Sequence, residues 1–412
     1  MLVLSLILFL QKMKISLISR WLLLIVCFAS CAVPTSAQFN AKQIDQELHQ
    51  VMAKENLPGM AVVMVNAKRM IYKNSFGKAD IAEDKAYTLH TTQEIGSVSK
   101  MILAVALMKA IELGYFTLET DINQLLPFKV INPYEPNHLI TVRELATHTS
   151  GIIDNPVVYT NTYRFHLELR PYSQAYLPPL QALGYKRTLR DSTLSEFYFN
   201  YLAKNGQYYS PENFLYNAST RTFSYSNIAT ALIAYLIELK SGISYNDFTS
   251  IHIFRPLHMQ HSAWFTADLR LSRLAQLYYN ADVNFPLYDL VTYPDGGLKT
   301  NASDLSKFLM DVINGLSGKS VVLKPQSFRT MFTAQFSSTN PPARINLNTR
   351  NKGILWNLYP NGTIGHDGDD PGVSSFLVFN PSTGLGGLFL SNKYMDDKSS
   401  IINIITKAIS HQ

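Results

Sequence analysis

The sequence predicts an α/β protein in which one β-sheet is built from both ends of the chain and a helical lobe is inserted between them. Three observations lead to this prediction. Strand-like segments occur near both ends, helix-like segments fill the middle, and neither an internal repeat nor a long linker interrupts the 412 residues. Hydrophobic residues make up 47% of the chain, which is enough for a large core and excludes general disorder.

The charge pattern gives little support for nucleic-acid binding. The chain carries 36 basic and 30 acidic residues, for a formal net charge of +6. Three of the basic residues, Lys12, Lys14 and Arg20, lie in the first 37 residues, which hold no acid. The rest of the chain is therefore only mildly basic, and no run or stripe of Lys and Arg stands out. We expect no nucleic-acid partner.

The segment 1–37 has the pattern of an export signal peptide. Lys14 and Arg20 form a positive start, residues 21–29 form an apolar run, and residues 35–37 are small residues suited to cleavage. We therefore expect a protein exported to the periplasm or the extracellular space. Neither apolar run of this segment reaches about 18 residues, so a retained membrane anchor is the less favoured alternative.

Both cysteines of the chain, Cys27 and Cys31, lie inside this leader. Cleavage would leave a body without thiols, and so without disulfides or a thiolate metal site. The residues before Cys31 resemble a bacterial lipoprotein cleavage box, so a lipidated Cys31 that tethers the protein to a membrane stays open. The true start codon, Met1 or Met13, stays open as well, because the segment from Met13 is already a complete signal.

Hydrophobic spacing predicts the secondary structure in chain order. Residues 40–55 carry an apolar stripe at helical spacing, and residues 61–65 and 70–76 form a predicted β-hairpin. A helix over 98–113 is apolar nearly all round, so we expect it to be central, with Gly114 just after its end. The remaining predicted elements are a capped helix at 141–147, helices at 226–240, 303–314 and 397–409, and strands at 354–359, 374–379 and 385–391.

These elements divide the body of the chain, residues 38–412, into two predicted lobes. The sheet lobe would comprise about 40–85 and 295–412, and the helical lobe about 86–294. Residues 155–220 are irregular and dense in Tyr, Phe and Pro. They form either an aromatic rim over the substrate pocket or additional core of the helical lobe.

The first chemical motif is Ser97-x-x-Lys100. Residues i and i+3 share a helix face, so the two side chains would meet at the start of the buried helix. A serine hydroxyl becomes a good nucleophile when a neighbouring base takes its proton, and a Lys can do this where burial lowers its pKa. A second copy, Ser75-x-x-Lys78, spans a Gly at a strand end. The alternative role of Ser97 is a plain helix cap.

Two further motifs offer groups that such a serine needs. Tyr225-x-Asn227 opens a hydrophobic helix, where Tyr can relay a proton and Asn can bind an acyl amide, or where both are structural. His366-x-Gly368 begins the C-terminal strands, where Gly admits a substrate and His can bind a carboxylate or steer a proton. Aspartates follow His366, but no His partner for a metal is evident, so we expect neither metal nor cofactor.

The order and spacing of these three motifs resemble the serine β-lactamase and penicillin-binding-protein superfamily. The most similar branch is the class C β-lactamase-like group, which includes D,D-carboxypeptidases, D-aminopeptidases and esterases. The stretches at 145–152, 254–259 and 294–305 are also similar to segments of that branch, so the resemblance covers roughly residues 40–410. It implies a three-layer α/β sandwich on an antiparallel sheet, with an all-helical inserted lobe.

The resemblance also implies a two-step acyl transfer. Ser97 would be the acylated nucleophile, and Lys100 and Tyr225 would share the general acid and base work. The oxyanion hole would be formed by the backbone N–H groups of Ser97 and Asp369, and such donors stabilise a tetrahedral oxyanion. Water would then clear the acyl-enzyme, so no cofactor or metal is needed.

Substrate binding is implied for Asn227, His366 and Gly368. His366 stands where true class C lactamases have Lys, and Asp369 stands where many relatives have a small residue, so nearby acids would repel anionic substrates. Both departures favour a secreted D,D-peptidase or esterase. The alternatives are a β-lactamase, and a penicillin-binding receptor or scaffold without turnover. The substrate would be a peptidoglycan peptide, an ester or a β-lactam, and the oligomeric state is open.

Overall fold

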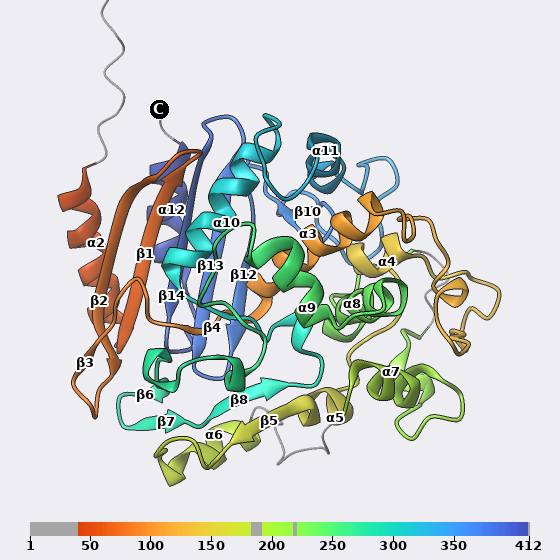
Figure 1. Cartoon of the computed structure of the whole chain (residues 1–412), viewed down its shortest axis with the longest axis horizontal. Coiled ribbons are helices and arrows are strands. Elements are labelled where there is room, and N and C mark those ends of the chain that lie inside the picture. The colour runs from red at the N-terminus through yellow and green to blue at the C-terminus, as the bar shows by residue number, and fades with distance from the viewer. Residues whose placement is uncertain (1–39, 183–191, 217–220, 411–412) are drawn as a thin grey trace, which may run out of the picture. The chain divides into compact units, whose positions relative to one another are not determined.

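The central sheet has eight strands in the order β10-β11-β12-β13-β14-β1-β2-β3, and all neighbours are antiparallel (Figure 1). The N-terminal strand β1 lies beside the C-terminal strand β14, with Met60 opposite Ser391. The predicted sheet built from both ends of the chain is therefore confirmed. Its strands are β1 (Gly59–Asn66), β2 (Met70–Asp80), β3 (Lys85–Ala86), β10 (Asn351–Lys352), β11 (Asn357–Leu358), β12 (Ile364–Asp370), β13 (Val373–Asn380) and β14 (Leu385–Ser391).

The structure is a computed structural model that describes residues 40–182, 192–216 and 221–410. The predicted export leader lies outside the described residues, together with Cys27, Cys31 and the alternative start at Met13. The export and lipidation hypotheses therefore stay predictions.

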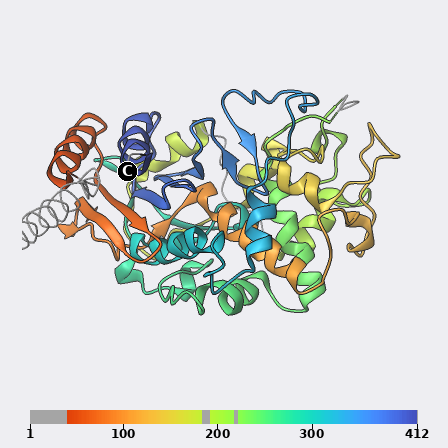
Figure 2. The ribbon, with the colours of Figure 1, turned by 90° about the horizontal axis from the view of Figure 1, so that it is seen from above.

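Helices cover both faces of the sheet and give three layers (Figure 2). Helices α2 (Ala41–Lys54) and α12 (Ser399–Ser410) pack on one face, and α10 (Ala302–Gly315) packs on the other. Successive side chains of a strand point to opposite faces of the sheet, so neighbouring residues of β14 lie against different helices. An added Cβ on Gly386 would meet Leu309 of α10, whereas one on Gly387 would meet Ile405 of α12. The predicted three-layer sandwich is confirmed.

The inserted helical region is built around α3 (Ser99–Glu112), which is buried along most of its length. Its apolar residues leave no polar face, so it packs against α8, α9 and α11. Gly114 follows its end with a φ of +77°, as predicted. The other helices are α4 (Val142–Thr147), α5 (Pro156–Tyr159), α6 (Leu177–Ala182), α7 (Leu194–Leu202), α8 (Asn227–Ser241), α9 (Tyr245–Thr249) and α11 (Pro325–Phe332). The division into lobes near residues 86 and 294 stays a prediction.

Two local predictions need correction. The predicted strand 354–359 is reduced to β11, and the adjacent β12 was not predicted as a separate strand. The sequence of β12, Ile-Gly-His-Asp-Gly-Asp-Asp, has low intrinsic strand preference, so its pairing with β13 decides its conformation. The region 155–220 is also more regular than expected, because it contains helices and a strand, β5 (Tyr163–His166), that pairs with β8 (Leu287–Leu290).

The tyrosines of this region mostly belong to the core. Tyr216 is exposed, and Tyr185 lies outside the described residues. The core interpretation accounts for most of the other rings, since a ring packed in the core is not free to contact a substrate. Four rings are buried and four more are partly buried against the core, namely Tyr163, Tyr176, Tyr198 and Tyr201, and Tyr159, Tyr172, Tyr208 and Tyr209.

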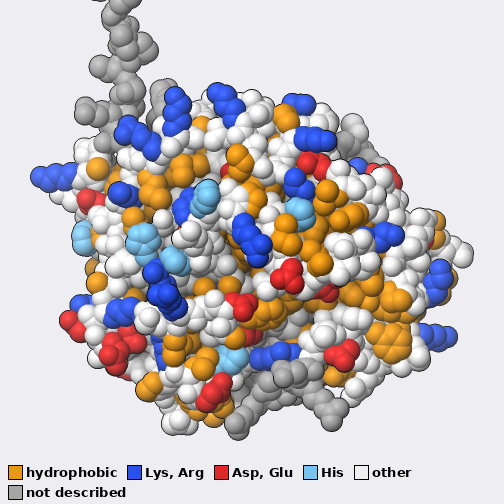
Figure 3. Space-filling model, viewed as in Figure 1, with side chains coloured by type: hydrophobic (Ala, Val, Ile, Leu, Met, Phe, Trp, Pro, Cys, Tyr) orange, Lys and Arg blue, Asp and Glu red, His pale blue; other side chains and the backbone are white. Residues whose placement is uncertain are grey.

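Charged side chains of both signs are interspersed over the face of the molecule shown in Figure 3. Among the described residues, no single helix is long and apolar enough to cross a bilayer, although the bent pair Asn227–Ser241 and Tyr245–Phe254 meets those criteria by length and composition. The first helix of that pair is buried over ten of its residues.

The packing of α12 gives a testable prediction about stability. Ile401, Ile405 and Ile409 are buried at intervals of four, whereas Asn403 faces solvent. We expect Ile405→Ala to lower the free energy of unfolding by about 2–5 kcal/mol, because it leaves a cavity against the sheet. We expect Asn403→Ala to change it by less than about 0.5 kcal/mol. Urea denaturation of both variants measures the difference, and equal effects would contradict this packing.

Candidate active site

Ser97 lies in a 3₁₀ turn, residues Gly96–Val98, directly before α3. Between residues 91 and 100 it is the one residue that is not buried. The N-cap position of α3 belongs to Val98, and no side-chain hydrogen bond caps the helix there. The interpretation of Ser97 as a plain helix cap is therefore wrong, and its hydroxyl is available for another role. Ser75 and Lys78, the second copy of the motif, lie on strand β2 instead of a helix.

Lys100 is fully buried, and its ammonium group makes three hydrogen bonds. Nζ donates to Ser97 Oγ at 3.0 Å, to Asn227 Oδ1 at 2.7 Å and to the backbone carbonyl of Asp295 at 2.7 Å. An ammonium group has three N–H donors, so all of them are used. Lys100 thus joins three segments of the chain beside Ser97.

Tyr225 completes the contacts of Ser97. Its hydroxyl donates to Ser97 Oγ at 2.9 Å, and Lys100 Nζ lies 5.1 Å from the centre of its ring. The residue is 37% exposed, so one side of the ring borders solvent. The structure therefore brings together Ser97, Lys100, Tyr225 and Asn227, as the family resemblance implies.

The sequence-based reasoning missed Asp154, which fixes the start of α8. Its carboxylate accepts hydrogen bonds from Ser226 Oγ, from Ile228 N and from both the backbone and side-chain nitrogens of Asn227. The side-chain amide of Asn227 is thereby oriented, with its oxygen toward Lys100. The sequence offers no signal for this role, because Asp154 lies 73 residues from Asn227.

The resting protonation states follow from these contacts. Burial alone would lower the pKa of Lys100, but Tyr225 and Asp295 act against it and the pKa is raised above its ordinary value. Desolvation raises the pKa of the Tyr225 hydroxyl, although Lys100 and Ser97 act to lower it. The condition for Lys100 to act as a base by itself, a pKa lowered by burial, is therefore not met. The resting pair is an ammonium beside a neutral phenol, and it must lose one proton before it can act as a base.

Strand β12 approaches the Ser97 turn backbone against backbone. An added Cβ on Gly368 would lie 2.3 Å from the Ile95 carbonyl oxygen and 2.9 Å from Ser97 N. An added Cβ on Gly96 would lie 2.8 Å from Asp369 N. Any side chain at Gly368 would push the strand away, so glycine is required for the close approach. The approach brings the predicted pair of oxyanion donors to the same end of the site.

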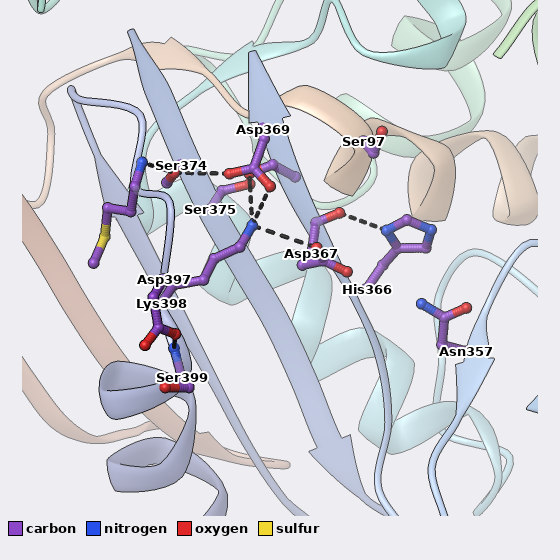
Figure 4. Close-up of polar contacts among 12 residues, drawn as sticks. Ser97, Asn357, His366, Asp367, Asp369, Ser374, Ser375, Asp397, Lys398 and Ser399 are labelled. Carbon is purple, nitrogen blue, oxygen red and sulfur yellow. Dashed lines mark hydrogen bonds and ion pairs between the residues drawn. The ribbon is translucent and has the colours of Figure 1, made fainter. Parts of the chain in front are cut away.

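Two of the acids on β12 meet a lysine that the sequence did not indicate. Lys398 Nζ lies 2.5 Å from Asp369 Oδ2 and 3.4 Å from Asp367 Oδ2 (Figure 4). The other carboxylate oxygen of Asp369 accepts a hydrogen bond from Ser374 Oγ at 2.7 Å. Lys398 stands just before α12, 29 residues after Asp369, so no local pattern could reveal the pair.

The third acid, Asp370, is buried and bonded to the hydroxyl of Tyr163. Burial raises the pKa of Asp370 to about 8 and that of Asp295 to about 6. Asp370 is therefore mostly neutral at pH 7. The expected repulsion of anionic substrates by these acids is therefore reduced, because Lys398 offsets one of the three carboxylates and protonation removes another.

His366 lies on β12 with its ring centre 6.2 Å from that of Tyr225, and it is 3% exposed. The structure thus places it beside Tyr225, which is bonded to Ser97. No group of three or more His, Cys, Asp or Glu residues that could hold a metal ion occurs among residues 40–182, 192–216 and 221–410.

A cavity of about 700 Å³ lies elsewhere, near the C-terminal end of α8. Tyr235, Leu239 and Tyr293 line it. None of Ser97, Lys100, Tyr225 and Asn227 lines this cavity.

Comparisons with known proteins identify the family of the chain. A protein-family model described as Beta-lactamase matches residues 44–406. The chain belongs to the beta-lactamase family. Among its relatives, penicillin-binding protein 4* of Bacillus subtilis (strain 168) is 23% identical over 390 residues, which cover 90% of this chain and 76% of that protein. Protein flp of Staphylococcus aureus (strain MRSA252) is 20% identical over 380 residues, covering 90% and 67%.

A solved structure also shares the fold of this beta-lactamase family member. The octameric penicillin-binding protein homologue from Pyrococcus abyssi aligns with a TM-score of 0.68 at 21% identity. The alignment covers 86% of this chain and 74% of that one. At this identity the likeness supports the fold, and the octamer is a property of the Pyrococcus abyssi protein.

The Lys398 contacts predict a charge effect on the site. We expect Lys398→Met to lower kcat/KM by about tenfold to a hundredfold, because the freed carboxylates of Asp367 and Asp369 would disfavour a developing oxyanion. Lys407→Met, an equal charge change on the exposed face of α12, is the control and should retain activity. Steady-state hydrolysis of a neutral nitrophenyl ester measures both, and equal activity of the two variants would contradict the role of Lys398.

Proposed function

We propose that the protein is a serine hydrolase of the class C β-lactamase-like type, which cleaves an amide or ester bond through an acyl-enzyme on Ser97. The observation that carries the proposal is the pair of hydrogen bonds to Ser97 Oγ, one from Lys100 at 3.0 Å and one from Tyr225 at 2.9 Å. A hydroxyl held between two proton-carrying groups is arranged for nucleophilic catalysis. Membership of the beta-lactamase family supports the same chemistry.

In the proposed first step, the Lys100–Tyr225 pair has lost one proton and accepts the proton of Ser97. Ser97 Oγ then attacks the substrate carbonyl carbon, and the carbonyl π electrons move to its oxygen. As the tetrahedral intermediate collapses, the bond to the leaving amine or alcohol breaks. The leaving group takes the proton from the same pair, so protons and electrons balance and an acyl-enzyme remains.

Backbone groups would stabilise the negative oxygen of this intermediate. The N–H groups of Ser97 and Asp369 are the proposed oxyanion donors, because β12 and the Ser97 turn meet at these residues. Asn227 would hold the acyl side of the substrate through its side-chain amide, which Asp154 orients. In the second step water attacks the acyl-enzyme, the pair accepts the water proton, and Ser97 leaves with that proton.

The proposed substrate class is a D,D-peptide or an ester instead of a β-lactam. The support is the His366-x-Gly368 sequence, which lacks the lysine of true class C lactamases. The name of the Bacillus subtilis relative, a penicillin-binding protein, supports recognition of penicillin-like molecules without deciding turnover. A β-lactamase and a receptor without turnover are the outcomes that the experiment below separates from this proposal.

We also propose that the protein is exported, on the support of the leader pattern in residues 1–37. The periplasm or the extracellular space would give access to peptidoglycan peptides. The intact mass of the mature protein tests this proposal. A chain that starts at residue 38 or at a lipidated Cys31 would support it, and a full-length chain would contradict it.

The nucleophile assignment is tested with two serine variants on one helical turn. We expect Ser97→Ala to abolish turnover and covalent labelling by a fluorescent penicillin, because the acylated oxygen is gone. Ser99→Ala should retain both, since Ser99 Oγ accepts a hydrogen bond from Leu298 N and faces the core. Steady-state assays with an ester, a D-Ala-D-Ala peptide and a penicillin rank the substrates. An active Ser97→Ala protein would overturn the proposal, and fastest turnover of penicillin would favour the β-lactamase.

The raised pKa values of Lys100 and Tyr225 predict the direction of the pH dependence. The Lys100–Tyr225 pair is reactive once it has lost one proton. The fraction of the protein in this form grows about tenfold per pH unit below the pKa of the pair. We therefore expect kcat/KM for a neutral ester to rise between about pH 6 and about pH 9. Tyr225→Phe should lower kcat/KM by about a hundredfold or more, because the proton relay is broken. A profile that falls with rising pH would contradict this assignment.

A further inference from the structure

Of the four side chains brought together at the site, Tyr225 is the most exposed, so its position needs support. It stands in the extended segment before α8 and not in the helix itself. A side chain with one open side can turn to another rotamer, and its hydroxyl would then leave Ser97 Oγ, which is 2.9 Å away. Contacts on the covered side must therefore hold the ring.

His148 contacts this segment at three points. Its backbone carbonyl accepts a hydrogen bond from Ser224 N at 2.8 Å, and its Nδ1 accepts one from Ser226 N at 3.3 Å. Its imidazole also lies against the Tyr225 ring, with the ring centres 4.5 Å apart and the planes at 31°. The two hydrogen bonds thus fix the backbone on both sides of Tyr225, and the imidazole covers one face of the phenol.

The tautomer of His148 follows from the same contacts. A backbone N–H group only donates, so Nδ1 is the bare acceptor and the neutral ring carries its proton on Nε2. Nε2 is buried and has no hydrogen-bond partner among the described residues. A buried donor without a partner costs free energy. The imidazole therefore serves its contacts with residues 224–226 and makes no second hydrogen bond that would tie it to the core.

The backbone of His148 gives a second, independent indication. The residue ends α4 at the C-cap position with φ of +59° and ψ of +40°, in the left-handed region. Glycine is the usual residue there, because a Cβ is unfavourable in this conformation. His148 is nevertheless buried, Phe223 meets its ring edge to face at 5.9 Å, and α4 packs against α8 (Figure 1). A buried imidazole at a position suited to glycine indicates a side chain with a role beyond ending the helix.

We propose that His148 is a positioning residue that holds the Tyr225 hydroxyl at Ser97. The inference rests on the proposed function for the role of Tyr225 as a proton relay. Loss of the imidazole would displace the phenol, but it would remove no group that is placed on the substrate. A displacement of about 1 Å can cost about a hundredfold in rate. The effect should therefore appear in kcat and in the rate of acylation, and only weakly in KM.

Two substitutions separate the contacts of the imidazole. His148→Phe keeps an aromatic ring and removes the acceptor for Ser226 N, whereas His148→Asn keeps an acceptor, suits the left-handed backbone and removes the ring. We expect each to slow acylation by a nitrophenyl ester and to lower kcat by about tenfold to a hundredfold, with KM within about threefold of the unmodified value. His90→Asn, the same change at an exposed histidine, is the control and should keep both constants.

A double-mutant cycle shows whether His148 acts through Tyr225. In Tyr225→Phe the phenolic hydroxyl is already absent, so adding His148→Asn should lower the remaining acylation rate by less than about twofold. A histidine that only stabilises the fold would give the same fold-change in both backgrounds. Such additivity would overturn the proposal, and so would an unmodified acylation rate in both His148→Phe and His148→Asn.

Nuclear magnetic resonance of ¹³C-labelled tyrosine tests the positioning without any substrate. The Tyr225 signal is assigned by its loss in Tyr225→Phe. We expect this signal to move toward that of a freely rotating tyrosine in His148→Asn and to stay in place in His90→Asn. A Tyr225 signal that does not change in His148→Asn would overturn the proposal.

The two experiments also separate this proposal from the proposed function. If the Tyr225 signal moves as expected but the unmodified protein is acylated by none of the substrates, the proposed function alone fails. If the unmodified protein is acylated and both histidine variants match it, the role of His148 alone fails. Cooperative melting shows whether each variant folds, and if one does not, the other decides, since each removes a different contact.

Discussion

The buried ammonium of Lys100 is the interaction on which the rest of the site depends. A charge removed from water needs partners for all of its donors, and Lys100 finds them on Ser97, Asn227 and the Asp295 carbonyl. These three groups come from the turn before α3, from the start of α8 and from the short 3₁₀ turn Tyr293–Asp295. The fold must therefore bring three distant segments together, or leave a buried charge unsatisfied.

The central sheet also borders the site, next to the three segments that contact Lys100. Strand β12 reaches the Ser97 turn because Gly368 and Gly96 carry no side chains. The same strand carries three aspartates, which are held in two different environments. Lys398 pairs with Asp369 and lies near Asp367, while Asp370 is buried against Tyr163. The negative charge of this acidic strand is thereby partly offset.

Local chemistry made part of this arrangement predictable. Ser97 and Lys100 are one helical turn apart, and the apolar run after them indicates a buried helix whatever the rest of the fold is. Tyr225 and Asn227 share the start of one helix in the same way. Their meeting with Ser97 followed only from the family resemblance, because 128 residues separate Tyr225 from Ser97.

The remaining features depend on tertiary contacts that the sequence does not encode locally. Asp154 and Lys398 carry no motif, and their contacts appear only when the start of α8 and the segment before α12 are placed beside the site. Strand β12 escaped prediction because its Gly and Asp residues lack the alternating apolar pattern of a strand. The raised pKa of Lys100 was also beyond sequence reasoning, since burial and the neighbouring phenol act in opposite directions.

The most direct test of the central role of Lys100 is the rate of acylation of Ser97 in Lys100→Met. Rapid mixing with a fluorescent penicillin or a nitrophenyl ester, followed by intact mass spectrometry, measures adduct formation in a single turnover. We expect acylation to slow by about a hundredfold to ten-thousandfold in a protein that still melts cooperatively, because the proton relay loses one member. Acylation at the unmodified rate would contradict the dependence of the site on this ammonium group.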